Sequence, residues 1–435
     1  MSELSAFRGK IVHCLRDPGV ASDSGAVEYF SDGLLLVRNG HVAEVGPAAK
    51  LLQNLSEDCS ITDCKQSWIL PGFIDCHVHY PQLDIIASYG ERLLDWLNTY
   101  TYPAEAHFGD AAYAHETAEF FLDELLRNGT TSAMVFATVH PESVDAIFAS
   151  AQRRHMRLWS GKVLMDRHCP DSLQDNPVTG YDDSLALLER WHGQDRLQYA
   201  ITPRFAPTSS HQQLTAAGRL ADKHPDVYIH SHLAESQAEV AWVAELFPDQ
   251  VSYVGVYEHY GLLRERSIYA HCLHLEDTGV NAMAASGAAM AFCPSSNLFL
   301  GSGLFDLERA AAAGARVGLG TDVGGGTSLN MLRTIGDAYK ALQLRGQPLS
   351  AIRALYLATL GAAEALYADD KLGNFQRGKE ADFVVLNTQN RPLVNRRLTR
   401  ADNLSEALFA LMILGDDRLV RQTYVLGEPA LPLPA

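Results

Sequence analysis

The chain has 435 residues, of which 47% are hydrophobic and 20% are charged, a composition typical of a globular protein with one large domain and a smaller one. Its formal net charge of -17 argues against nucleic acid or an anionic membrane surface as a partner. Seven cysteines without a CxxC pair argue against a disulfide framework and favour reduced thiols in a cytoplasmic protein.

Both ends of the chain show short strand and turn patterns rather than targeting or membrane segments. Charges interrupt every apolar run from Met1 to Gly19, so we expect no signal peptide. The apolar run at residues 407–414 is far too short to cross a bilayer. We expect the two ends, residues 1–70 and 371–435, to build one small β-sandwich-like accessory domain.

Between these ends, the chain alternates candidate strands with helical patterns. The candidate strands are residues 73–79, 131–138, 158–165, 197–204, 227–233, 268–272, 289–293 and 317–321. Helical patterns include residues 110–127, 143–154, 182–191, 212–223 and 235–246. Strands that alternate with helices pair in parallel, and eight such units can close into a (β/α)8 TIM barrel over residues 71–370. An open doubly wound sheet is the alternative, but it gives no reason for polar residues to recur at so many strand ends.

The first candidate strand ends in two histidines, His77 and His79. Because strand side chains alternate between faces, both imidazoles can point into one cavity. Barrel active sites use the C-terminal ends of several strands, and there the fifth strand has His232, the sixth His271 and the eighth Asp322. Imidazole nitrogens and a carboxylate suit a divalent transition metal such as zinc, with bonds of about 2.0–2.2 Å.

Each of these residues also has an ordinary interpretation. A lone strand-end histidine is more often a surface or core residue, and Asp322 precedes a glycine-rich turn. His230 shares a strand face with His232 and competes with it as a ligand. We favour His232 because Glu235 follows it three residues later. The joint placement of five such residues at four strand ends favours a metal site over chance.

At these residues the sequence resembles the amidohydrolase superfamily of metal-dependent hydrolases, over nearly its whole length. The resemblance rests on PGFIDCHVHYPQ at 71–82, NGTT at 128–131, ITPRF at 201–205, HLAE at 232–235, AHC at 270–272, CPSSNL at 293–298, GTDVGGGTS at 320–328 and GKEAD at 378–382. It implies hydrolytic deamination of a purine base, guanine, to xanthine and ammonia, as a step of purine breakdown. It also implies a homodimer.

The resemblance further bears on the number of metal ions. Two-metal members of the superfamily use a bridging lysine at the end of the fourth strand, which here ends in Arg204. Lys162 lies within the third candidate strand and not at its end. We therefore expect one zinc ion per chain, with iron as the alternative because it accepts the same ligands.

The expected chemistry assigns a role to each residue near the metal. A metal lowers the pKa of its bound water towards about 7, which makes hydroxide available. Asp322 would take the proton from that water, and His271 would steer it besides binding the metal. Glu235 would donate a proton to a ring nitrogen and then to the departing amine, which a raised pKa in a dry pocket favours. The ordinary interpretation of Glu235 is an acid in the first turn of a helix.

The resemblance implies substrate contacts from residues of the metal site, namely His79, His232 and Asp322, and from three further residues. Gln82 offers an amide, Arg204 a hydrogen bond to a purine carbonyl that adenine lacks, and Phe205 a ring to pack on the base. Without the resemblance, a loop role for Gln82 and a core role for Phe205 are the simpler interpretations. Trp96 and Tyr100 are further pocket candidates.

Three other functions are less favoured than this one. A related hydrolase could act on another heterocycle, such as cytosine, a triazine or an adenosine derivative. A non-catalytic scaffold would keep the barrel and lose ligands, yet all five ligand positions and Glu235 are present. A nucleic-acid editing deaminase would carry HxE and PCxxC motifs, which this chain lacks.

Overall fold

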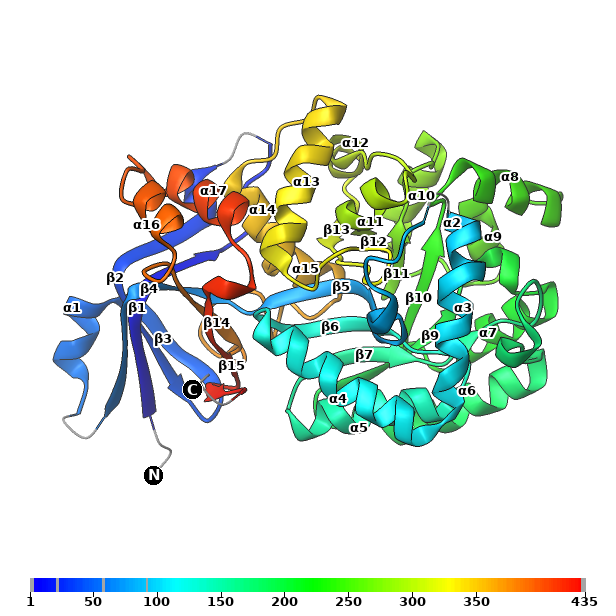
Figure 1. Cartoon of the computed structure of the whole chain (residues 1–435), viewed down its shortest axis with the longest axis horizontal. Coiled ribbons are helices and arrows are strands. Elements are labelled where there is room, and N and C mark those ends of the chain that lie inside the picture. The colour runs from blue at the N-terminus through cyan, green and yellow to red at the C-terminus, as the bar shows by residue number, and fades with distance from the viewer. Residues whose placement is uncertain (1–3, 21–22, 57–58, 91–92, 432–435) are drawn as a thin grey trace.

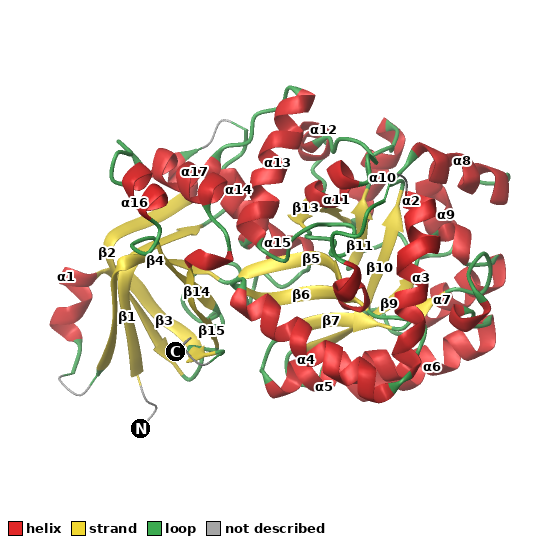
Figure 2. Ribbon diagram, in the orientation of Figure 1, coloured by secondary structure: helices red, strands yellow, loops and turns green. Residues whose placement is uncertain are grey.

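The computed structural model describes residues 4–20, 23–56, 59–90 and 93–431. The two chain ends, coloured blue and red, lie together on one side, and the middle of the chain forms the other side (Figure 1). Strands dominate the first part, whereas helices surround the strands of the second part (Figure 2).

The larger part is a parallel sheet in the order β13-β12-β11-β10-β9-β7-β6-β5, with the short strand β8 (Val163–Leu164) paired to β9. Its strands are β5 (Phe73–His79), β6 (Thr130–Phe136), β7 (Arg157–Gly161), β9 (Leu197–Pro203), β10 (Tyr228–Leu233), β11 (Ser267–His271), β12 (Ala289–Phe292) and β13 (Arg316–Leu319). The expected (β/α)8 barrel is confirmed, and the open doubly wound alternative is set aside.

The third predicted strand differs from the observed one. It divides into β7 and β8, and Lys162 lies at the break instead of within one strand. The backbone N–H of Lys162 donates to the hydroxyl of Tyr199 over 3.2 Å. Its ammonium pairs with Asp175 at 2.5 Å.

Hydrogen bonds outside the ladders bring the first and last barrel strands together. The backbone N–H of Asp322 donates to the carbonyl of His77 over 2.8 Å. The backbone N–H of His79 donates to the carbonyl of Val323 over 2.8 Å. The barrel is therefore joined at the ends of β5 and β13, where the candidate ligands lie.

Apolar side chains that precede candidate ligands in β5 and β11 belong to one buried cluster of the barrel. Ile74 lies three residues before His77, and Ile268 lies three residues before His271. Trp159 is fully buried in the same cluster. Because the apolar layer occupies the middle of the barrel, the strand ends are left for polar chemistry.

Helices cover the barrel, mostly as predicted. Those before β12 are α2 (Leu93–Trp96), α3 (Tyr102–Glu105), α4 (Ala111–Arg127), α5 (Pro141–Arg153), α6 (Pro177–Trp191), α7 (His211–Lys223), α8 (Gln237–Leu246), α9 (Tyr253–His259) and α10 (Asp277–Ser286). Those after it are α11 (Pro294–Phe299), α12 (Leu307–Ala312), α13 (Met331–Arg345), α14 (Ala351–Ala358) and α15 (Leu360–Ala365). The predicted stop after α4 is confirmed, since Asn128 caps the helix and Gly129 follows with a φ of 84°.

The smaller part is one seven-stranded sheet in the order β16-β15-β14-β4-β1-β2-β3, built from both chain ends. Its strands are β1 (Leu4–Cys14), β2 (Val27–Arg38), β3 (His41–Pro47), β4 (Ser60–Pro71), β14 (Phe383–Asn387), β15 (Val420–Val425) and β16 (Glu428–Pro429), with α1 (Ala48–Leu51) after β3. Only Gly72 separates β4 from β5, and a Cβ there would lie 2.1 Å from the hydroxyl of Thr131. The exact boundaries of the accessory domain, residues 1–70 and 371–435, stay a prediction.

The C-terminal segment contains helices where the sequence indicated mainly strands. Between β14 and β15 lie α16 (Pro392–Leu398) and α17 (Leu404–Leu414). The Asn403 side chain caps α17 by accepting from the backbone N–H of Glu406, and five of the eleven residues of the helix are buried. Among the described residues, no helix is long and apolar enough to cross a membrane.

Candidate metal centre and active site

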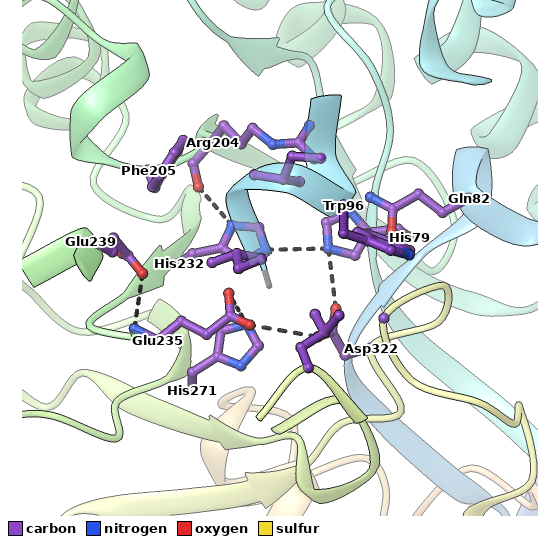
Figure 3. A pocket seen from close by; sticks show the side chains of 14 residues that line it. His79, Gln82, Trp96, Arg204, Phe205, His232, Glu235, Glu239, His271 and Asp322 are labelled. Carbon is purple, nitrogen blue, oxygen red and sulfur yellow. Dashed lines mark hydrogen bonds and ion pairs between the residues drawn. The ribbon is translucent and has the colours of Figure 1, made fainter. Parts of the chain in front are cut away.

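Four side chains from three strand ends converge on one point. The Nε2 atoms of His77 and His79 lie 3.1 Å apart, and Nε2 of His232 lies 3.2 Å from that of His79. Oδ1 of Asp322 lies 3.2 Å from Nε2 of His77 and 3.3 Å from Nε2 of His79. We call these four residues the ligand group. His79, His232 and Asp322 point toward one another in Figure 3.

The protonation of the histidines fits a bound cation. Burial lowers the pKa of His79 to about 3 and that of His232 well below its usual value, so both rings are neutral. Nδ1 of His232 lies 2.7 Å from the carbonyl oxygen of Arg204, to which it donates. Its Nε2 therefore presents a lone pair to the centre. Neutral imidazoles with Nε2 atoms this close repel one another unless a cation lies between them, so the donor set suits a divalent metal.

Asp322 supplies the negative charge of the ligand group. Burial acts to raise its pKa, but the contacts with His77 and His79 hold that pKa well below its usual range. The carboxylate is therefore ionised. The backbone of Asp322 has a φ of 51°, and His271 and Cys272 have φ values of 73° and 53°. Left-handed backbone at non-glycine residues clusters at functional sites, because the surrounding structure must hold it there.

His271 lies beside the ligand group rather than within it. Its Nε2 is 3.7 Å from Oδ2 of Asp322 and 3.4 Å from Oε2 of Glu235. Its Nδ1 is fixed by Oδ1 of Asn297 at 2.9 Å. The buried Nε2 has no hydrogen-bond partner in the described part of the chain, so it is free to bind a metal or a water. His271 as a metal ligand stays a prediction.

His230, the candidate that competes with His232 as a ligand in the sequence, lies outside the close group of ligand atoms, whereas the favoured His232 lies within it. Instead, Nε2 of His230 lies 2.7 Å from Nδ1 of His77, and the side chain is fully buried. A metal-binding histidine commonly uses its second nitrogen in this way, which fixes the orientation of the ring.

Glu235 precedes its helix. The helix expected over residues 235–246 begins at Gln237, with Ser236 as its N-cap. Ser236 and Glu239 form a capping box, which sets the start of the helix two residues later than expected. The interpretation of Glu235 as an acid in the first helical turn is therefore wrong.

The Glu235 carboxyl is almost fully buried, 3% exposed. Burial, and next the charge of Asp322, raise its pKa to about 8. The hydroxyl of Ser302 donates to its Oε1 over 3.1 Å. At neutral pH the carboxyl is thus mainly protonated, and it can act as a proton donor beside the ligand group.

A single cavity opens onto the ligand group and contains most of the predicted substrate contacts (Figure 3). It is lined by His79, Gln82, Leu93, Trp96, Leu97, Arg204, Phe205, His232, Glu235, Glu239, His271, Leu300, Asp322 and Gly325. Tyr100, a further candidate, does not line it.

Sequence reasoning missed several supporting residues. Asp75 is fully buried, and its Oδ1 accepts from the backbone N–H groups of His77 and Thr321 at 3.1 and 3.0 Å. Asp75 lies two residues before His77 in β5, so the strand periodicity alone predicts that it shares a face with the histidines. Glu105, which contacts two predicted substrate residues, lies in a short helix with no motif around it.

Comparisons with known proteins agree with this geometry. Residues 68–430 match the amidohydrolase family. The chain belongs to that family.

Within the family, the chain is similar to guanine deaminases. The guanine deaminase of Escherichia coli (strain K12) is 47% identical over 426 residues, 98% of this chain and 97% of that protein. A solved structure of E. coli guanine deaminase is 46% identical with a TM-score of 0.97, over 99% of this chain and 100% of that one. The guanine deaminase from C. acetobutylicum, solved with guanine bound in its active site, is 29% identical with a TM-score of 0.88, over 98% of this chain and 100% of that one.

Proposed function

We propose that this protein is a guanine deaminase, which hydrolyses guanine to xanthine and ammonia. The observation that carries the proposal is the position of the protonated Glu235 beside the ligand group, in one cavity with Gln82 and Arg204. The identity of 47% to a guanine deaminase over nearly the whole chain supports the same substrate. The cytoplasmic location and the homodimer stay predictions.

We assign the metal as one zinc ion per chain, with iron as the alternative, held by His77, His79, His232, His271 and Asp322. When bound, such a metal supplies an activated water by lowering its pKa towards about 7. Lys162 supports a single ion, because its ammonium is already paired with Asp175 at 2.5 Å.

The side chains of the cavity account for the proton transfers. Asp322, ionised by its histidine contacts, accepts a proton from the attacking water as the new C–O bond forms at the ring carbon that carries the amine. Glu235 donates its proton to the adjacent ring nitrogen. The ionised Glu235 then takes the proton of the new hydroxyl group and passes it to the amine, the C–N bond breaks as the C=O bond forms, and ammonia leaves. The proton held by Asp322 restores Glu235. His271, 3.4 Å from Glu235, is placed to orient the water.

The remaining predicted contacts fit a planar base. Arg204 can donate to the purine carbonyl, and Gln82 can bond the ring edge through its amide. Phe205 offers its ring to the base, and it is 4% exposed in the cavity wall. The backbone carbonyl of Arg204 also holds His232, so recognition and metal binding share one strand end.

The proposal is tested by incubating the purified, metal-loaded protein with guanine and following xanthine by its absorbance. Cytosine, adenosine and a chlorinated triazine serve as competing substrates. Guanine turnover with little activity on the others is the expected result. Turnover of another heterocycle without guanine turnover would overturn the proposal.

A further inference from the structure

We propose that Glu105 is a positioning residue that selects purines with a ring carbonyl, because it fixes Arg204 and Gln82 in one orientation. The inference rests on the proposed function, since it concerns recognition of the same base. It adds a residue that neither the sequence motifs nor the ligand group includes.

Glu105 is the last residue of α3 and has no exposed surface. Its Oε2 accepts from Nη1 of Arg204 over 2.7 Å, and its Oε1 accepts from Nε2 of Gln82 over 3.1 Å. One carboxylate therefore joins a side chain that follows β5 to another that follows β9.

The orientation of Gln82 is a direct consequence. A carboxylate can only accept hydrogen bonds, so the amide nitrogen of Gln82 must face Glu105. The amide oxygen then faces the backbone N–H of Gly324, which donates to it over 3.2 Å. Without Glu105 the amide could turn over and exchange its donor and acceptor edges.

Arg204 is held as firmly. It is 2% exposed, and its guanidinium lies 5.3 Å from the centre of the Tyr102 ring, at the start of the same helix as Glu105. A guanidinium carries only donors, and those not used by Glu105 are available to the cavity that Arg204 lines. A purine carbonyl satisfies such donors, whereas a bare C–H leaves them unpaired in a buried site.

The alternative is that Glu105 only neutralises a buried cation. In that case its loss would weaken binding of every purine by the same factor. If Glu105 instead fixes the donors of Arg204 and Gln82, its loss should lower the affinity mainly for purines that carry the carbonyl. The ratio of two dissociation constants separates the two roles.

The test uses hypoxanthine and unsubstituted purine, two ligands that differ by the ring carbonyl. Their dissociation constants are measured by calorimetry on the zinc-loaded wild-type protein, on Glu105→Gln and on the charge-preserving Glu105→Asp. We expect the wild-type protein to bind hypoxanthine at least about tenfold tighter than purine, and both variants to lose most of that preference while keeping their zinc. An Asp side chain is too short to reach Arg204 and Gln82 together, so it serves if the glutamine variant does not fold.

A matched control is Glu380→Gln. Glu380 likewise joins two buried side chains, Arg157 at 2.5 Å and Arg196 at 2.6 Å, but at the opposite ends of the barrel strands. It should leave the preference for hypoxanthine unchanged.

An unchanged preference in both Glu105 variants, or equal loss of affinity for the two ligands, would overturn the inference while guanine turnover by the wild-type protein leaves the proposed function standing. Absence of guanine turnover in the wild-type protein would overturn both.

Discussion

Nδ1 of His77 lies 2.7 Å from Nε2 of His230, so one buried histidine orients another that belongs to the ligand group. Nδ1 of His230 has no partner in the described part of the chain, so His77 is its principal polar contact. The pair links a strand-end ligand of β5 to the middle of β10. His230 therefore orients a residue of the ligand group and does not itself belong to that group.

Replacing His230 by alanine should weaken metal binding without removing a ligand. Loss of such a supporting partner typically costs about 10–100-fold in metal affinity. The measurement is a zinc titration against a competing chelator. His115, which is half exposed on α4, is the control position, and His115→Ala should bind zinc as the wild-type protein does. Unaltered zinc affinity in His230→Ala would contradict the supporting role.

Glu235→Gln should retain the metal and lose turnover, since glutamine keeps the shape of the side chain but has no acidic proton to transfer. We expect a fall in kcat of about 10²–10⁴-fold, the range for loss of a general acid or base. His77→Ala should instead lose metal and activity together. The two variants are compared by metal analysis and by guanine turnover. A near-normal rate in Glu235→Gln would show that another group carries the proton.

Removal of the metal should abolish activity reversibly. The ligand atoms of the ligand group all lie within 4.8 Å of one another, and Nε2 of His79 lies 3.1–3.3 Å from each of the other three, a spacing that suits a shared cation. Dialysis against a chelator followed by addition of zinc should restore guanine turnover in proportion to the zinc bound. If the chelated protein contained no metal and retained its activity, the ligand group would have another purpose.

His13 should make stability depend on pH. It is 1% exposed in β1, and burial lowers its pKa from 6.5 to about 4. Between these values the unfolded chain binds a proton that the folded chain does not, so the free energy of unfolding falls as the pH falls. At about pH 4 the free energy of unfolding is lower by about 3 kcal/mol, and above about pH 6.5 this difference is absent.

The His13 prediction is checked by urea unfolding of the wild-type protein and of His13→Leu at a series of pH values. Because other groups also titrate, the difference between the two proteins is the quantity to follow. As the pH falls below 6.5, the free energy of unfolding of the leucine variant should rise relative to that of the wild-type protein. Parallel curves over that interval would exclude a contribution from His13.

The strand ends could be predicted from the sequence because their signals are local. The period-two pair His77 and His79 lies in β5 as expected, and His232 and Asp322 join it. Long-range contacts of residues that carry no strand-end signal could not be predicted. Glu105 meets Arg204 across 99 residues, and no periodicity reports such a contact. The helix start at Gln237 was misjudged because the Ser236 capping box competes with the apolar pattern.

The C-terminal helices illustrate a second limit. Residues 404–414 have apolar side chains on nearly all sides, so the pattern shows no clear helical face. The apolar pattern of such a segment is equally compatible with a buried strand and a buried helix. The cap at Asn403 was the available signal.

The single glycine at position 72 makes the accessory sheet and the first barrel strand one continuous run of chain. Any shortened version of the protein that starts at the barrel must cut within this run, directly ahead of the segment that carries His77 and His79. Excising the N-terminal region should therefore weaken metal binding by the ligand group before it unfolds the distant helices, because the outer sheet leads directly into β5.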